Sequence, residues 1–235
     1  MNHPLRVPFH TSGRAKSNSH MYFRMCATSL VRYRTLAAEL AKLDRFAPNY
    51  DVTFERAEEA AVEPVIFAGM SLEASLFDLG ACLFGENFAE HTDKLDPVAK
   101  YFVIAQYIDR KAPNPASITL QSIQALVTAR NKLVHYKSQS MLEDDRTSII
   151  NKAKRAHDQH LAGISASFRA LVLLSLHFDG NIFEELRILP SFKKPEYWQT
   201  VVPPELHVDV KWYMFTGYPK LPTQAIGARA MYHVR

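Results

Sequence analysis

The sequence predicts an all-α protein: an antiparallel bundle of four to five long helices, followed by an irregular C-terminal extension rich in Pro and aromatic residues. Apolar residues recur at helical intervals through most of residues 21–178. The chain has 8 Gly in 235 residues, too few for a β-rich fold with many tight turns. After residue 179, prolines interrupt every periodic pattern. A hydrophobic content of 47% suffices for a substantial core.

Composition and charge divide the chain into three parts. We expect a flexible basic arm over residues 1–20, the helical bundle over 21–178 and the extension over 179–235. Residues 1–50 carry eight Lys or Arg against two Asp or Glu, whereas residues 51–100 carry three against eleven. The basic segments attract polyanions such as RNA, or segments of opposite sign pack against each other within a chain or between chains.

Two helices are expected in the first third of the chain. Leu30, Leu36 and Leu40 recur at roughly helical spacing and predict a helix over residues 21–46. A second helix is predicted from near Thr53 to Phe84, with a kink or a restart near Glu63 because the next residue is a proline. Its almost wholly apolar stretch, residues 65–84, is expected to be the central buried helix.

Capping signals predict the remaining helices. Asp96 followed by Pro97 marks a start, and the helix continues to residue 108. Ser117 caps a helix over residues 118–136. Acidic residues at 143–145 mark the start of the last bundle helix, which Gly180 ends. In the extension, residues 206–215 alternate in part, which favours a short strand, and the dense aromatic residues are expected to wrap the bundle or to cover a partner chain.

Several classes of site are absent from the sequence. Its two cysteines lie far apart, which excludes a disulfide framework and a Cys-based zinc site. No apolar run matches a signal peptide or a membrane span, so we expect a cytoplasmic protein with no membrane contact. No phosphate-binding or dinucleotide-binding glycine loop occurs, and we expect no cofactor. His157 and His160 share a helix face, but no second His–carboxylate pair accompanies them, so a solvated face is favoured over a metal site.

One segment carries a pattern typical of catalysis: Ala129-Arg130-Asn131-Lys132-Leu133-Val134-His135-Tyr136. The spacing Arg-x(4–6)-His occurs three times in the chain, also at Arg14…His20 and at Arg155…His160. The copy at Arg130 alone combines a following Asn, a long apolar helix before it and a helix end after it. This segment resembles the motif of the HEPN superfamily, whose members are bundles of four to five helices, many of them metal-independent ribonucleases.

The resemblance implies an activity and a set of roles. The chain is expected to be an endoribonuclease of the toxin or defence type, with RNA as substrate and an antitoxin or regulatory protein as partner. His135 is the expected acid/base group, Arg130 the transition-state stabiliser and Asn131 the orienting amide. Products end in 2′,3′-cyclic phosphate. The site is expected to be composite, formed by two motif helices across a homodimer.

Three further residues are expected to support this site. Glu73, on the apolar face of the second helix, is expected to orient Arg130, because a carboxylate in such surroundings is costly unless paired. Lys132 adds positive charge to the motif helix. Tyr136 directly follows His135, whereas toxins paired with nucleotidyltransferase antitoxins often carry His-x-Tyr, so regulation by modification of this tyrosine is not implied.

Two non-catalytic alternatives stay open. The chain can be a non-catalytic dimeric module that binds RNA, a nucleotide or a protein partner, with the Glu73–Arg130 contact a plain structural tie. It can also be a structural protein in which the extension makes the contacts. Arg130 and His135 lie about 140° apart on a helix of 3.6 residues per turn, so the sequence does not show whether both side chains reach one site. If the structure places both in one cleft, the nuclease is favoured over these alternatives.

Overall fold

The computed structural model describes residues 17–135, 146–178 and 188–216, and every regular element in these ranges is a helix. This confirms the prediction of an all-α protein. The elements are α1 (Ser19–Leu40), α2 (Tyr50–Phe84), α3 (Glu86–Thr92), α4 (Pro97–Asp109), α5 (Ile118–Val134), α6 (Arg146–Phe178), α8 (Pro195–Trp198), the 3₁₀ turn η1 (Pro204–Leu206) and α9 (His207–Thr216). Residues 1–16 of the predicted arm and Tyr136 of the motif lie outside the described ranges.

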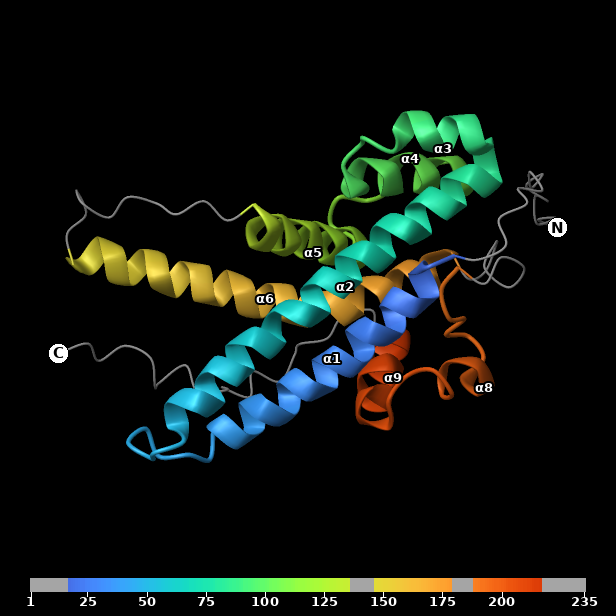
Figure 1. Cartoon of the computed structure of the whole chain (residues 1–235). Helices are drawn as coiled ribbons and strands as arrows, with labels where there is room; N and C mark the ends of the chain where they lie inside the picture. Colours follow the sequence, from blue (N-terminus) through green and yellow to red (C-terminus); the bar gives the residue numbers. More distant parts are fainter. Residues whose placement is uncertain (1–16, 136–145, 179–187, 217–235) are drawn as a thin grey trace.

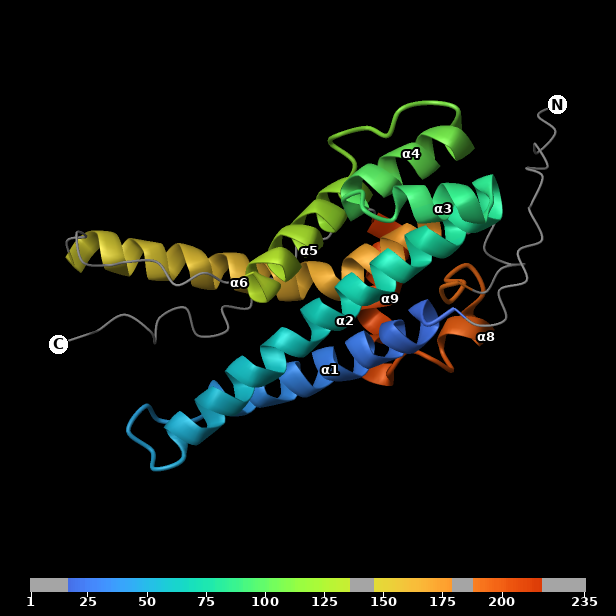
Figure 2. The ribbon, with the colours of Figure 1, turned by 45° about the horizontal axis from the view of Figure 1, so that its top comes forward.

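The long helix α2 is the axis of the molecule. Helix α1 packs along it, and α5 packs along α6 on its other side, so that α2 crosses this second pair near its own middle (Figure 1). Helices α3 and α4 cover one end of α2, and the first half of α6 extends beyond α5 in both views (Figure 2). The last turns of α5 therefore lie where the two helix pairs cross.

Local signals explain where several helices begin. The Asp96 side chain accepts a hydrogen bond from the Val98 N–H at 2.8 Å, and Ser117 accepts one from the Leu120 N–H at 3.3 Å, as predicted for both caps. Gly85 has a φ of +90°, a conformation that glycine adopts without strain, and the chain turns there from α2 into α3.

Three features of the helices differ from the prediction. Helix α2 runs without interruption through Pro64, so of the two predicted alternatives the restart near Glu63 is wrong, and the kink stays a prediction. Pro64 is itself buried, and side-chain packing along α2 outweighs the one hydrogen bond that the proline lacks. Helix α1 ends at Leu40 rather than near residue 46, and the short helix α3 was not predicted.

The core is built around the second half of α2, as predicted. Val65, Leu72 and Leu79 are fully buried, and they pack with large apolar side chains from α1, α5, α6 and the extension. Phe192 and Trp198 of the extension belong to the same core. The C-terminal residues that the structure describes therefore close the bundle instead of standing apart from it.

The short strand favoured over residues 206–215 is wrong, because this segment forms η1 and α9. Leu206, Val210 and Tyr213 are buried against the bundle, and their spacing of four and three residues is helical. A bidentate ion pair fixes α9 to α1, with Arg34 nitrogens 2.7 and 3.0 Å from the Asp209 oxygens. Tertiary contacts thus determined the secondary structure of a segment whose sequence pattern fits both a strand and a helix.

Two helical segments are long and apolar enough to cross a membrane by length and composition: α2 and residues 157–178 of α6. In the most apolar 18-residue window of each segment, 61% and 67% of the residues are buried inside the bundle. The core helix of a water-soluble protein passes the same test, so this observation gives little weight to membrane insertion.

Candidate functional site

The motif segment occupies the C-terminal turns of α5. One side of this helix is buried, with Leu120, Ile123 and Leu126 in the core, and the periodicity continues to Ala129. Arg130 and Asn131 follow at the edge of the buried side and are partly exposed. Because the preceding turns are anchored in the core, the backbone of Arg130 and Asn131 is held in place before any ligand arrives.

The guanidinium of Arg130 is bound on two sides. Its Nη2 lies 3.1 Å from Oε1 and 3.3 Å from Oε2 of Glu73 on α2. Its Nη1 donates a hydrogen bond of 3.0 Å to Oδ1 of Asn131. The Arg130 side chain retains 27% of its accessible surface, so the planar cation is oriented yet open to solvent.

Glu73 lies nearer the surface than its sequence context suggested. Its side chain is 37% exposed, so it stands at the rim of the apolar face of α2 instead of inside it. The pairing with Arg130 is present, and the orienting role stays a prediction. These two residues, together with Asn131, line a small hollow whose other walls are Gly69, Leu72, Pro97 and Val127.

His135 is the residue that caps α5 at its C-terminal end. Its backbone N–H donates to the Asn131 carbonyl at 2.9 Å, and its side chain is exposed. Within the described ranges, no hydrogen bond or ion pair joins its imidazole to Arg130 or Asn131. One chain therefore pairs Arg130 with Glu73 and presents His135 at the same helix end, with no hydrogen bond between the Arg130 and His135 side chains.

Two contacts fix the register between α5 and α6. The Lys132 ammonium donates a hydrogen bond to the Gln159 side chain, so this predicted supporting residue ties the two helices together. Three residues earlier on α5, Ala129 lies directly against Gly163 of α6. The antiparallel pair is thereby set with the motif helix in close contact with α6.

The competing Arg-x(4–6)-His copy lies in a different environment. Arg155 is exposed and His160 is partly buried on α6. Burial lowers the pKa of His160, Glu58 on α2 raises it, and His157 lowers it further. In the part of the chain that the structure describes, no cluster of three or more His, Cys, Asp or Glu is arranged to hold a metal ion.

A second cluster of titratable groups was missed from the sequence. His177, in the last turn of α6, has its Nε2 3.3 Å from Oδ2 of Asp109, the last residue of α4, although the contact lacks hydrogen-bonding geometry. Burial lowers the pKa of His177, and Asp109 opposes this shift. Burial and the same carboxylate raise the pKa of Tyr101 to about 12. Asp109 and His177 lie near the ends of their helices and Tyr101 lies inside α4, so the three residues form no pattern in the sequence.

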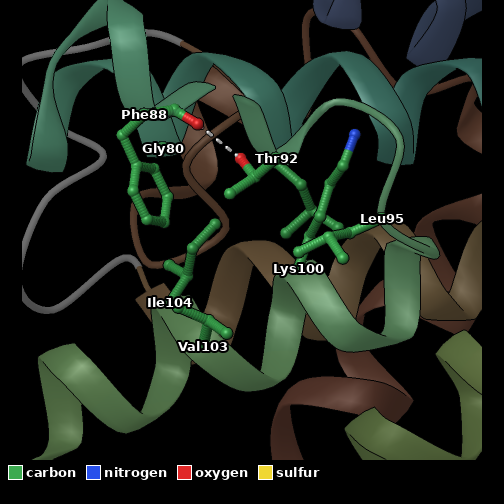
Figure 3. Close-up of a pocket in the computed structure, with 8 residues that line it drawn as sticks. Gly80, Phe88, Thr92, Leu95, Lys100, Val103 and Ile104 are labelled. Carbon is green, nitrogen blue, oxygen red and sulfur yellow. Dashed lines mark hydrogen bonds between the residues drawn. The ribbon is translucent and has the colours of Figure 1, made fainter. Parts of the chain in front are cut away.

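A further hollow lies between α2, α3 and α4 (Figure 3). Its walls are mainly apolar, and its polar lining groups are already bonded. Thr92 donates to the Phe88 carbonyl at 2.8 Å, and the buried Lys100 donates to Asp93 at 3.2 Å. With no polar group turned toward a ligand, this hollow is a weaker candidate than the Arg130 site.

The Arg130 site is suited to an anion. A guanidinium next to an amide binds a phosphate or a carboxylate, and the exposed imidazole one helical turn away is a group that can accept or donate a proton. Comparison of the chain with protein-family models, with curated proteins and with solved structures found no match.

Proposed function

We propose that this protein is a HEPN-like, metal-independent endoribonuclease of the toxin or defence type. The observation that supports the proposal most directly is the Arg130 guanidinium, held between Glu73 and Asn131 and open to solvent, with His135 exposed at the end of the same helix. A plain structural ion pair does not require a histidine beside it, whereas phosphodiester cleavage requires both a cation and a proton acceptor.

The reaction uses the ribose as its own nucleophile. An imidazole of His135 removes the 2′-OH proton, the 2′-oxygen attacks the adjacent phosphorus, and the P–O5′ bond breaks. The 5′-oxygen leaves with a proton returned by an imidazolium, and the other fragment ends in a 2′,3′-cyclic phosphate. Arg130 stabilises the charge that develops on the non-bridging oxygens, and Asn131 orients the phosphate or the imidazole.

The proposal includes a homodimer. Within one chain no hydrogen bond joins the His135 imidazole to Arg130, and a second motif helix packed across a two-fold axis would supply a further catalytic group. RNA is then the substrate, and an antitoxin or regulatory protein in the cytoplasm would control access to the paired site.

A second candidate function is a non-catalytic dimeric module that binds RNA, a nucleotide or a protein. One observation favours it: Glu73 already neutralises Arg130, and a pair of this kind can simply stabilise the crossing of α2 and α5.

The test incubates purified wild-type protein with total RNA in EDTA and maps the 3′ ends of the fragments. We expect cleavage that leaves cyclic phosphates. His135→Ala should lower the rate by about 10²–10⁴-fold and Arg130→Lys by about 10²–10³-fold. His91→Ala removes another exposed histidine, on α3, and should leave the rate unchanged.

The outcomes separate the two functions. Equal cleavage by wild type and His135→Ala would identify a contaminating nuclease and refute the proposed endoribonuclease function. Absence of cleavage, combined with RNA binding by a dimer in light scattering and filter binding, would select the non-catalytic module.

A further inference from the structure

The stem of Arg130 lies against the backbone of α2 at a glycine. A Cβ placed on Gly69 would stand 2.9 Å from Cγ of Arg130, 3.5 Å from its Cβ and 3.8 Å from its Cδ. Carbon atoms in ordinary contact are about 3.5–4.0 Å apart. The arginine stem therefore occupies the space that any side chain at this position would take.

Glu73, which binds the head of the same arginine, follows Gly69 by four residues. Residues four apart share one face of a helix. Helix α2 thus presents, one turn apart, a flat seat for the aliphatic stem and a carboxylate for the guanidinium. Arg130 is fixed at both ends of its side chain by one helix face.

We infer that Gly69 is a positioning residue of the Arg130 site: it admits the arginine stem onto α2 and so sets where the guanidinium meets its anionic ligand. The inference rests on the proposed function for its kinetic consequence. A methyl group at Gly69 would push the stem outward by roughly 0.5–1 Å to restore ordinary contact, and the head would leave Glu73 or reach it from a different direction.

The matched control is another glycine of the same helix. Gly80 is buried in α2, but a Cβ there would meet the Phe88 ring at 3.9 Å, which is ordinary contact. Gly80→Ala therefore makes the same chemical change in the same helix and disturbs nothing at Arg130. Both substitutions favour the helix, because alanine is the better helix former.

The experiment compares wild type, Gly69→Ala and Gly80→Ala in cleavage kinetics, thermal unfolding and ¹⁵N NMR of the Arg130 guanidinium, assigned with Arg130→Lys. Hindered rotation of the ion-paired guanidinium gives resolved Nη signals. We expect Gly80→Ala to match wild type in NMR and kinetics. We expect Gly69→Ala to lose the resolved signals and to lower kcat by roughly 10–100-fold, the size of effect of a 1 Å misplacement, with KM within about twofold and no loss of thermal stability beyond that of Gly80→Ala.

The NMR result does not depend on catalysis. If wild type cleaves no RNA, the proposed nuclease function fails, while the guanidinium signals still decide whether Gly69 positions Arg130. Unchanged signals and unchanged kcat in Gly69→Ala would overturn the inference.

If Gly69→Ala does not fold, Gly69→Ala/Arg130→Ala is compared with it. If removal of the Arg130 side chain restores folding, the packing of its stem against Gly69 is supported. Failure of this double variant to fold would overturn it.

Discussion

Gly163→Ala should lower the free energy of unfolding, although alanine is a better helix former than glycine. A Cβ at Gly163 of α6 would stand 2.3 Å from Cβ of Ala129 on α5 and 3.9 Å from Cγ2 of Val65 on α2. Two methyl groups need about 3.5–4.0 Å, so α5 and α6 must separate or slide by more than 1 Å. Ala129 has no rotatable side chain with which to make room.

The magnitude follows from two opposed terms. Overpacking of a well-packed contact costs about 1–3 kcal/mol, and this contact lies at the severe end. The gain from Gly to Ala within a helix is about 1 kcal/mol. The net loss is about 2 kcal/mol, which corresponds to a fall in Tm of roughly 4–8 °C for a chain of this size.

Urea unfolding followed by circular dichroism measures this loss. Gly80→Ala is the control and should be neutral or stabilising, because its Cβ meets no atom closer than 3.9 Å. The variant Ala129→Gly/Gly163→Ala moves the methyl group from one helix to the other and should recover packing, which appears as a favourable coupling in a double-mutant cycle. A Gly163→Ala protein at least as stable as Gly80→Ala would refute the reasoning.

Three other predictions concern the rest of the structure. Asp209→Asn removes the partner of the half-exposed Arg34 and should lower the free energy of unfolding by about 1 kcal/mol, less at high salt, as urea titrations at two ionic strengths will show. Burial lowers the pKa of His20, His160 and His177 from 6.5, so below that pH the unfolded chain binds more protons than the folded chain. The free energy of unfolding should therefore be highest above about pH 6.5 and fall as the pH drops below it. His160→Gln should reduce this pH dependence in urea midpoints measured from pH 5.5 to 8. Burial raises the pKa of Cys26 to about 12, so its thiol should react with Ellman's reagent at pH 8 only in urea, with Cys26→Ser identifying its share of the signal; rapid native-state reaction would contradict the packing of α1.

The elements that were predictable carry their signal in neighbouring residues. Asp96 and Ser117 accept hydrogen bonds from the first turns of their own helices, so the starts of α4 and α5 were readable from short stretches. The central role of residues 65–84 was equally local, since a helix that is apolar all round must be buried. The prediction for residues 206–215 failed because apolar residues at 206, 208, 210 and 212 alternate in the sequence, whereas Val208 and Trp212 are exposed in the helix.

The candidate site divides in the same way. The motif residues Arg130, Asn131 and His135 were identified because they lie close together in sequence, and Glu73 was singled out as a carboxylate on an apolar face. The seat at Gly69 had no sequence signal, because a glycine inside a helix is ordinary until the atom opposite it is known. That no hydrogen bond joins the Arg130 and His135 side chains likewise needed coordinates.

By itself the sequence determined that this chain is helical, where most of its helices lie, which of them is central, and which short segment merits a chemical test. Periodicity, capping and charge act within a few residues, and these properties survive in any packing of the chain. The tertiary structure decided the angle at which α2 crosses α5 and α6, the close approach at Gly163 and the pairing of Glu73 with Arg130. Such contacts join residues up to 98 positions apart, and they depend on how whole helix surfaces fit, which no local pattern specifies.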